Sequence, residues 1–386
     1  MLLNTRARLA TLAAMLSLLV ITFQATAATY HVAQDDSGDF EYVYDAVDAA
    51  ASGDTVTIGP GVYPNVREWV APGGLVEVIA VVDVDELTII GAGRDLVTLG
   101  PAVPAPNVEF GPDGIVCTVD GNVRVEGVTI RNVNNGVAGN DRWATVQNCR
   151  FTGCDIGFKG FTSERVRAES CEFVDNDDGM VSFVVRGAFE TVVEDCLFEG
   201  NSVGLDIQTE GGVVSDCHFW GNFVGAQVSF GGQSVVRDSI FEESGNFDLA
   251  LAGARVELTE SYFGIGVPVN IQVQGLLTGS GNVLMGGTFA TMKVSSRAAI
   301  DFTDNHILNN GGRTILLNPA DFPVGPHNFE DNYWGTNDVA QIEEWIFDQN
   351  DEQFDGLGLV DFMPFAGNPV STDESSFGAF KAQFGN

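Results

Sequence analysis

Short runs of alternating apolar and polar residues recur along the chain, separated by glycine, asparagine and aspartate. Alternation with a period of two is typical of half-buried strands, and the intervening residues favour tight turns. In the segment 204–208, for example, Leu205 and Ile207 alternate with Asp206 and Gln208. Long helical periodicity is nearly absent. The pattern therefore predicts an all-β protein built from many short strands.

One motif repeats at a nearly constant interval in the middle of the chain. It places a phenylalanine two residues after a small residue, and the small residues are Cys149, Cys171, Cys196, Cys217, Ser239 and Ser261, separated by 22, 25, 21, 22 and 22 residues. A polar turn motif such as Asn201-Ser-Val-Gly204 follows the phenylalanine. A fixed period indicates a solenoid. Three short strands fill about 22 residues, so coils are expected to stack as parallel strands about 4.8 Å apart.

Segments at both ends of this repeat add a family resemblance. They are Tyr30-His-Val-Ala-Gln-Asp-Asp-Ser-Gly-Asp39, Tyr44-Asp-Ala-Val-Asp-Ala-Ala50, Gly53-Asp-Thr-Val-Thr-Ile-Gly-Pro-Gly-Val-Tyr63 and Asn332-Tyr-Trp-Gly-Thr336. Across residues 29–366 the chain resembles the right-handed parallel β-helix, or pectin-lyase-like, superfamily. The resemblance implies a right-handed parallel β-helix solenoid capped by short helices. That superfamily includes lyases, hydrolases, esterases, epimerases and non-enzymes, so the resemblance implies no single activity.

These features divide the chain into five parts. We expect a signal peptide over 1–27, an N-terminal cap with a strand and a short helix over 28–75, the β-helix over 76–336, a C-terminal cap over 337–366 and a tail over 367–386. Arg6 and Arg8 precede an apolar run and the small residues Ala25-Thr-Ala27, as in bacterial export signals. No later apolar stretch approaches the roughly 20 residues that span a bilayer. The expected location is periplasmic or extracellular.

The charge balance narrows the class of partner. The chain has 53 acidic and 18 basic residues and a formal net charge of −35. Nucleic acid is excluded as a partner, because its binding rests on phosphate neutralisation by lysine and arginine. Scattered arginines such as Arg165 and Arg167 are expected to pair with local carboxylates.

The repeating cysteines predict a column of thiols. An even number of cysteines in an exported protein ordinarily suggests disulfides. Here Cys149, Cys171, Cys196 and Cys217 occupy equivalent places in successive coils, where side chains in register lie parallel to one another. We therefore predict a buried column of free, unreactive thiols.

A second column, of acidic and polar residues, directly precedes these thiols. Its members include Asn148, Ser170, Asp195, Asp216, Asp238 and Glu260. Short polar side chains favour turns. Stacked carboxylates near 5 Å also repel by about 1 kcal/mol per pair, and calcium would relieve this repulsion. Two interpretations remain open: turn formation, and a calcium site at Asp195, Asp216, Asp238 and Glu260.

The strand after each polar turn predicts a ligand-binding face. Its alternation places Leu205 and Ile207 inward, with Asp206 and Gln208 outward. Equivalent positions in neighbouring coils extend this into a polar strip that contains Lys159, Asp206, Gln208, Gln227, Asp248, Asn270 and Gln272. In related proteins such an elongated face binds polysaccharide. Asp206 and Asp248 are the candidate catalytic pair, although at about 10 Å they lie at the long limit for inverting glycoside hydrolysis.

The leading hypothesis is a secreted β-helix protein that interacts with polysaccharide or cell-surface glycans and has no recognisable catalytic set. A polysaccharide lyase or glycoside hydrolase that acts along the same strip is the first alternative. A structural envelope protein stabilised by calcium is the second.

Overall fold

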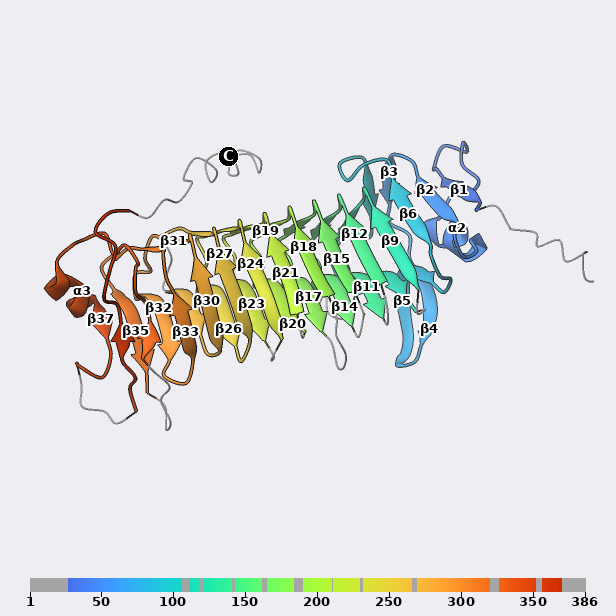
Figure 1. The fold of residues 1–386 in the computed structure, drawn as a ribbon. Coiled ribbons are helices and arrows are strands. Elements are labelled where there is room, and N and C mark those ends of the chain that lie inside the picture. Colours follow the sequence, from blue (N-terminus) through green and yellow to red (C-terminus); the bar gives the residue numbers. More distant parts are fainter. Residues whose placement is uncertain are drawn as a thin grey trace, which may run out of the picture.

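The computed structural model describes residues 27–105, 111–118, 121–140, 143–161, 165–183, 190–209, 211–229, 232–265, 269–319, 326–351 and 356–369. These residues form an elongated solenoid of three long sheets, with a short helix at each end (Figure 1). The predicted signal peptide and tail lie almost entirely outside them. No helix of this described part is long and apolar enough to cross a membrane.

The described strands make sheets of 14, 11 and 13 strands, here called the first, second and third sheets. The first contains β1 (Thr29–Val32), β2 (Thr55–Ile58), β6 (Thr88–Gly91), β9 (Asn122–Glu126), β12 (Trp143–Gln147), β15 (Arg165–Glu169), β18 (Glu190–Glu194), β21 (Gly211–Ser215), β24 (Gln233–Arg237), β27 (Arg255–Thr259), β30 (Leu276–Ser280), β33 (Ala299–Phe302), β36 (His327–Asn328) and β38 (Val360–Asp361). The second contains β3 (Gly61–Tyr63), β7 (Val97–Leu99), β10 (Thr129–Arg131), β13 (Arg150–Thr152), β16 (Glu172–Val174), β19 (Leu197–Glu199), β22 (His218–Trp220), β25 (Ile240–Glu242), β28 (Tyr262–Phe263), β31 (Val283–Leu284) and β34 (His306–Ile307). The third contains β4 (Arg67–Ala71), β5 (Gly74–Val82), β8 (Asp113–Cys117), β11 (Asn135–Asn140), β14 (Ile156–Phe161), β17 (Asp178–Phe183), β20 (Val203–Gln208), β23 (Val224–Ser229), β26 (Phe247–Ala252), β29 (Val269–Val273), β32 (Ala290–Ser295), β35 (Arg313–Asn318) and β37 (Ile346–Phe347).

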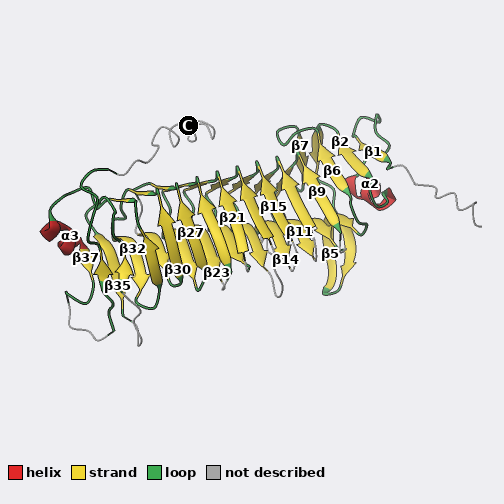
Figure 2. Ribbon diagram, in the orientation of Figure 1, coloured by secondary structure: helices red, strands yellow, loops and turns green. Residues whose placement is uncertain are grey.

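Each central coil contributes one strand to each sheet, as β21, β22 and β23 do; β21 and β23 are labelled in Figure 2. Strands of successive coils pair in parallel and in register, so that equivalent residues stack in columns. Phe198 pairs with Phe173 on one side and with Phe219 on the other. Their rings are buried and stacked, with 4.8 Å between the centroids in both pairs. The repeat in the sequence therefore becomes a continuous apolar core.

The thiol column is confirmed. All six cysteines are free and buried. Burial raises the pKa of Cys171 well above its usual range and raises the pKa of Cys154 to about 12, so these thiols stay protonated. Further along, the column of Cys149 continues as hydroxyls and then amides: the Ser261 N–H donates to Asn282 Oδ1 at 3.0 Å, and the Asn282 N–H donates to Asn305 Oδ1 at 2.9 Å.

The acidic column owes its composition to backbone geometry. Asn148, Ser170, Asp195, Asp216, Asp238, Glu260, Asp304 and Asp331 all have φ between 47° and 58°. This left-handed region is costly for most side chains and least so for glycine, asparagine and aspartate. Glycine takes the same place at Gly127 and Gly281. The turn interpretation thus accounts for the residue types.

A column of glycines marks the bend into the third sheet. It includes Gly157, Gly179, Gly204 and Gly225, and a Cβ atom at any of them would meet the carbonyl oxygen of the next coil, closer than real Cβ atoms approach. The phenylalanine rings pack against the same positions. Close stacking of the backbone at this bend therefore excludes a side chain.

The ends of the solenoid are covered by two helices. Helix α2 (Val43–Ala49) buries Val43, Ala46 and Val47 and packs on β5. Helix α3 (Val339–Trp345) is N-capped by Asp338, whose side chain accepts a hydrogen bond from the Ala340 N–H, and it packs on β37 and β35. Both agree with the short helices expected to cap the solenoid. Such caps hide strand edges that would otherwise pair with other chains.

Candidate functional site

The outward face of the third sheet carries most of the predicted polar strip. One column of this face contains Lys159, Val181, Asp206, Gln227, Ala250, Gln272 and Lys293. The side chains of Lys159, Asp206, Gln208, Gln227 and Gln272 are half-buried, whereas Leu205 and Ile207 are fully buried. The outward orientation of these five residues is confirmed. Val181 and Ala250 interrupt the strip.

The outward orientation predicted for Asp248 and Asn270 is wrong. Both side chains are fully buried. They occupy the column that holds Gly204 and Gly225 in earlier coils. At this column and at the next residue along each strand, two consecutive positions face inward. Asn270 Nδ2 donates to Asp248 Oδ2 at 2.8 Å. Neither residue is on the surface strip, and Asp248 does not face Asp206 there as a catalytic partner.

Two aromatic side chains lie on the same outward face, two residues beyond the polar column. Phe161 pairs with Phe183 in register, and their rings stack with 5.4 Å between centroids. Phe161 is 40% exposed, which is unusual for a phenylalanine in a strand that also packs a core. In the next coil Gln208 takes the equivalent place. This pair is absent from the predicted strip, although the alternation in β14 places Phe161 on the side of Lys159.

Two carboxyl groups, on β17 and β20, have altered acidity. Burial, followed by the charges of Asp177, Asp206 and Asp155, raises the pKa of Asp178 to about 6, and Lys159 opposes this shift. Burial also raises the pKa of Asp206. The Asp206 Oδ2 accepts a hydrogen bond from Gln208 Nε2 at 2.5 Å. Its buried Oδ1 accepts none from the residues that the structure describes.

We call this surface the central patch and define it by Lys159, Phe161, Asp178, Phe183, Asp206 and Gln208. It combines an aromatic platform, a cation, two carboxyl groups of raised pKa and an unsatisfied acceptor, all on the rigid strands β14, β17 and β20. Acids with raised pKa values in one place are candidates for a functional site. The sequence pointed to three of these six residues as site members, Lys159, Asp206 and Gln208.

The predicted calcium ligands remain in their turn column. Ser170 Oγ donates to Asp195 Oδ2 at 2.8 Å, and Arg237 pairs with Asp238 at 2.8 Å. Burial and the charge of Asp238 raise the pKa of Asp216, as expected for stacked acids. Within the described ranges, no group of three or more histidine, cysteine, aspartate or glutamate side chains is arranged to hold a metal ion.

Comparison with known proteins addresses the fold. Residues 107–241 match the family described as a right handed beta helix region. The chain folds as a right-handed parallel β-helix. No curated protein matches the sequence.

Solved structures similar to this β-helix include the Agl-KA catalytic domain, which is 13% identical with a TM-score of 0.52, over 83% of this chain and 64% of that one. The catalytic unit of a thermostable GH87 alpha-1,3-glucanase from Streptomyces thermodiastaticus strain HF3-3 is 14% identical with a TM-score of 0.44, over 72% of this chain and 62% of that one. The β-helix thus spans less than two thirds of either structure. The similarity to the Agl-KA catalytic domain shows a shared fold alone.

Proposed function

We propose that this β-helix is a secreted protein that binds polysaccharide or cell-surface glycan chains along the outward face of its third sheet, centred on the central patch. The observation that carries the proposal is the stacked pair Phe161 and Phe183 beside the carboxyl group of Asp206. Aromatic faces pack on the apolar faces of sugar rings, and carboxylates accept hydrogen bonds from sugar hydroxyls.

The electrostatics of the patch support this class of ligand. Asp206 Oδ1 is buried and accepts no hydrogen bond from the described residues, so the free energy lost on its desolvation is not recovered. A hydrogen bond donated by a ligand would recover it. Stacked coils repeat the polar positions at intervals of about 4.8 Å along the axis, which suits a linear polymer. The net charge of −35 disfavours polyanionic chains, since they would be repelled at long range.

Removal of the aromatic platform tests this proposal. We expect Phe161→Ala to weaken binding to a retained polysaccharide at least tenfold, because the stacking surface is lost. Asp206→Asn should weaken it severalfold, because the carboxylate acceptor is lost. Affinity electrophoresis in gels that contain neutral or acidic polysaccharides measures both changes.

Trp220→Ala is the matched control, since Trp220 is a partly exposed aromatic residue on the second sheet. It should leave binding unchanged. Equal retention of the wild type, Phe161→Ala and Asp206→Asn on every polysaccharide that binds would contradict the proposal.

A second candidate function is cleavage of the bound chain, and the acidity of Asp178 favours it. A carboxyl group with a pKa of about 6 is still largely protonated in mildly acidic solution and can act as a general acid. If Asp178 donates the proton, turnover is expected below about pH 6 and declines above it, as Asp178 ionises. Asp178→Asn should abolish product formation in chromatography of digests, and it should weaken retention in gels less than Phe161→Ala does. Absence of products from every polysaccharide that binds would leave the binding function alone.

A further inference from the structure

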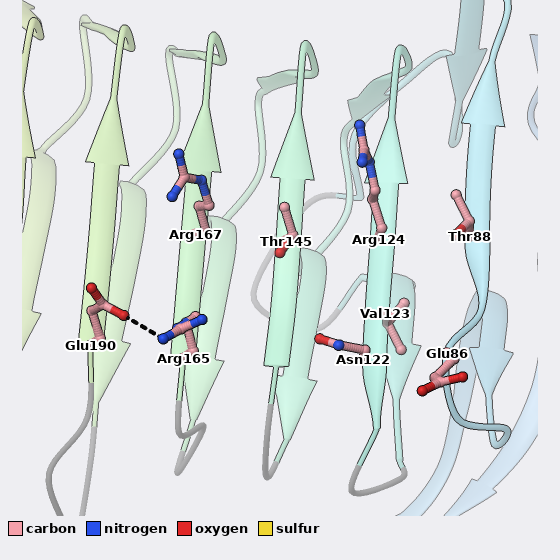
Figure 3. A pocket seen from close by; sticks show the side chains of 9 residues that line it. All are labelled: Glu86, Thr88, Asn122, Val123, Arg124, Thr145, Arg165, Arg167 and Glu190. Carbon is pink, nitrogen blue, oxygen red and sulfur yellow. Dashed lines mark ion pairs between the residues drawn. The ribbon is translucent and has the colours of Figure 1, made fainter. Parts of the chain in front are cut away.

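A second surface feature lies on the first sheet. It is an open pocket of about 600 Å³, formed by outward side chains of β9, β12, β15 and β18 together with residues at and just before β6 (Figure 3). The pocket lies on the first sheet, whereas the central patch lies on the third sheet. The volume falls within the range of ordinary small-ligand sites, which is roughly 300 to 1,000 Å³.

The register explains the shape of this pocket. Thr88, Arg124, Thr145 and Arg167 follow one another in a single row across four coils. The short Thr145 stands between two long arginines, which leaves a gap in the row (Figure 3). A second row beside it runs in register through Asn122, Trp143, Arg165 and Glu190. Eight of the nine lining residues are polar or charged, and all but Glu86 lie on strands of the first sheet.

Both arginines of β15 form ion pairs at this pocket. Arg165 contacts Glu190 at 2.8 Å. Arg167 contacts Glu194 at 3.0 Å and Glu169 at 3.3 Å. These side chains remain between 34% and 51% exposed. The ion pairs therefore face solvent and offer a ligand both hydrogen-bond donors and acceptors.

We propose that this pocket binds a short uncharged oligosaccharide that runs along the solenoid axis. An anionic ligand would have to displace glutamates that already neutralise the arginines, against a chain charge of −35. Hydroxyl groups both donate and accept, so a neutral sugar can bridge a guanidinium and its carboxylate without breaking the pair. The five coils from β6 to β18 extend about 19 Å along the axis, the length of several linked sugars.

The site is tested in a chain whose central patch has been disabled by Phe161→Ala and Asp206→Asn. Isothermal titration calorimetry then measures the binding of neutral hexasaccharides, namely α-1,3- and β-1,4-linked glucose, β-1,4-linked mannose and β-1,4-linked xylose, with an α-1,4-linked galacturonate hexamer for comparison. We expect at least one neutral hexamer to bind, with little dependence on salt. Adding Arg165→Gln should weaken that binding at least tenfold, and Thr145→Arg should block it by filling the gap.

Arg255→Gln is the matched control. Arg255 belongs to the same column as Arg165 but lies on β27, outside the pocket, so its loss changes the net charge equally and should leave affinity unchanged. Circular dichroism verifies that each variant is folded.

Three outcomes would overturn this site. They are the absence of any binding in the disabled chain, neutral binding that Arg165→Gln leaves unaltered, and preferential, salt-sensitive binding of the galacturonate hexamer. The proposal for the central patch is judged separately, since it depends on Phe161→Ala in the otherwise unaltered chain.

Discussion

The free energy of unfolding of the wild-type protein is expected to decrease as the pH rises from about 4 to about 7, and Asp248→Asn should abolish this decrease. Burial raises the pKa of Asp248 from 3.8 to about 7. The folded chain therefore binds a proton over this interval that the unfolded chain has released. By linkage, stability is greatest below the unfolded pKa, falls as the pH rises toward the folded pKa, and stays low above it.

The size of this effect follows from the shift. A change of about three pKa units corresponds to at most on the order of 4 kcal/mol at neutral pH. Asparagine resembles the protonated acid and can still accept the hydrogen bond from Asn270. The variant and the wild type should therefore have similar stability near pH 4, and the variant should be the more stable at pH 8.

Urea unfolding followed by circular dichroism at several pH values measures this difference. Asp83→Asn serves as the control, because Asp83 is exposed and its replacement removes the same charge. Parallel pH profiles for the wild type and Asp248→Asn would show that Asp248 does not hold a proton in the folded chain.

Gly204→Ala should destabilise the solenoid by about 3 kcal/mol, at the upper end of the usual cost of overpacking. The added Cβ atom would press on the carbonyl oxygen of Gly225, and backbone cannot yield as a flexible side chain does. It would also lie 3.2 Å from Phe198 Cβ and 3.3 Å from Phe219 Cδ1. The backbone stack and the aromatic column would have to shift together.

Gly212→Ala is the matched substitution. Its Cβ atom would contact chiefly the side chain of Ile207, with Cδ1 at 3.2 Å, which can adjust by rotation. Thermal and urea unfolding of the two variants should differ by about 2 kcal/mol or more. Equal stability of the two would mean that the coils can separate at Gly204 without cost.

The periodic features of this protein were predictable from sequence because stacking places equivalent residues in equivalent surroundings. The phenylalanine column and the free thiols both follow from the repeat of about 22 residues. The same reasoning identified the outward positions Asp206 and Gln208, since alternation within a strand fixes which side chains face the core.

Prediction failed where the backbone departs from that alternation. Asp248 and Asn270 are predicted to face outward as a continuation of the face of Asp206 and Gln208 in neighbouring coils. At the bend into the third sheet, however, two consecutive positions face inward, as Gly204 and Leu205 both do. The signal was present in the sequence, because Asp248 occupies the position that glycine holds in the preceding coils.

The sequence by itself determined the solenoid, its period, its core columns and its polar outward strip, because these depend on local alternation and on contacts between adjacent repeats. Only the tertiary structure decided which outward residues gather into a site. Phe161 and Phe183 meet because two coils align in register, and Asp178 is shifted in pKa because burial and carboxylates from other coils surround it. The pocket on the first sheet likewise depends on the order in which arginine and threonine stack, which pairs residues that lie 21 or more positions apart in sequence.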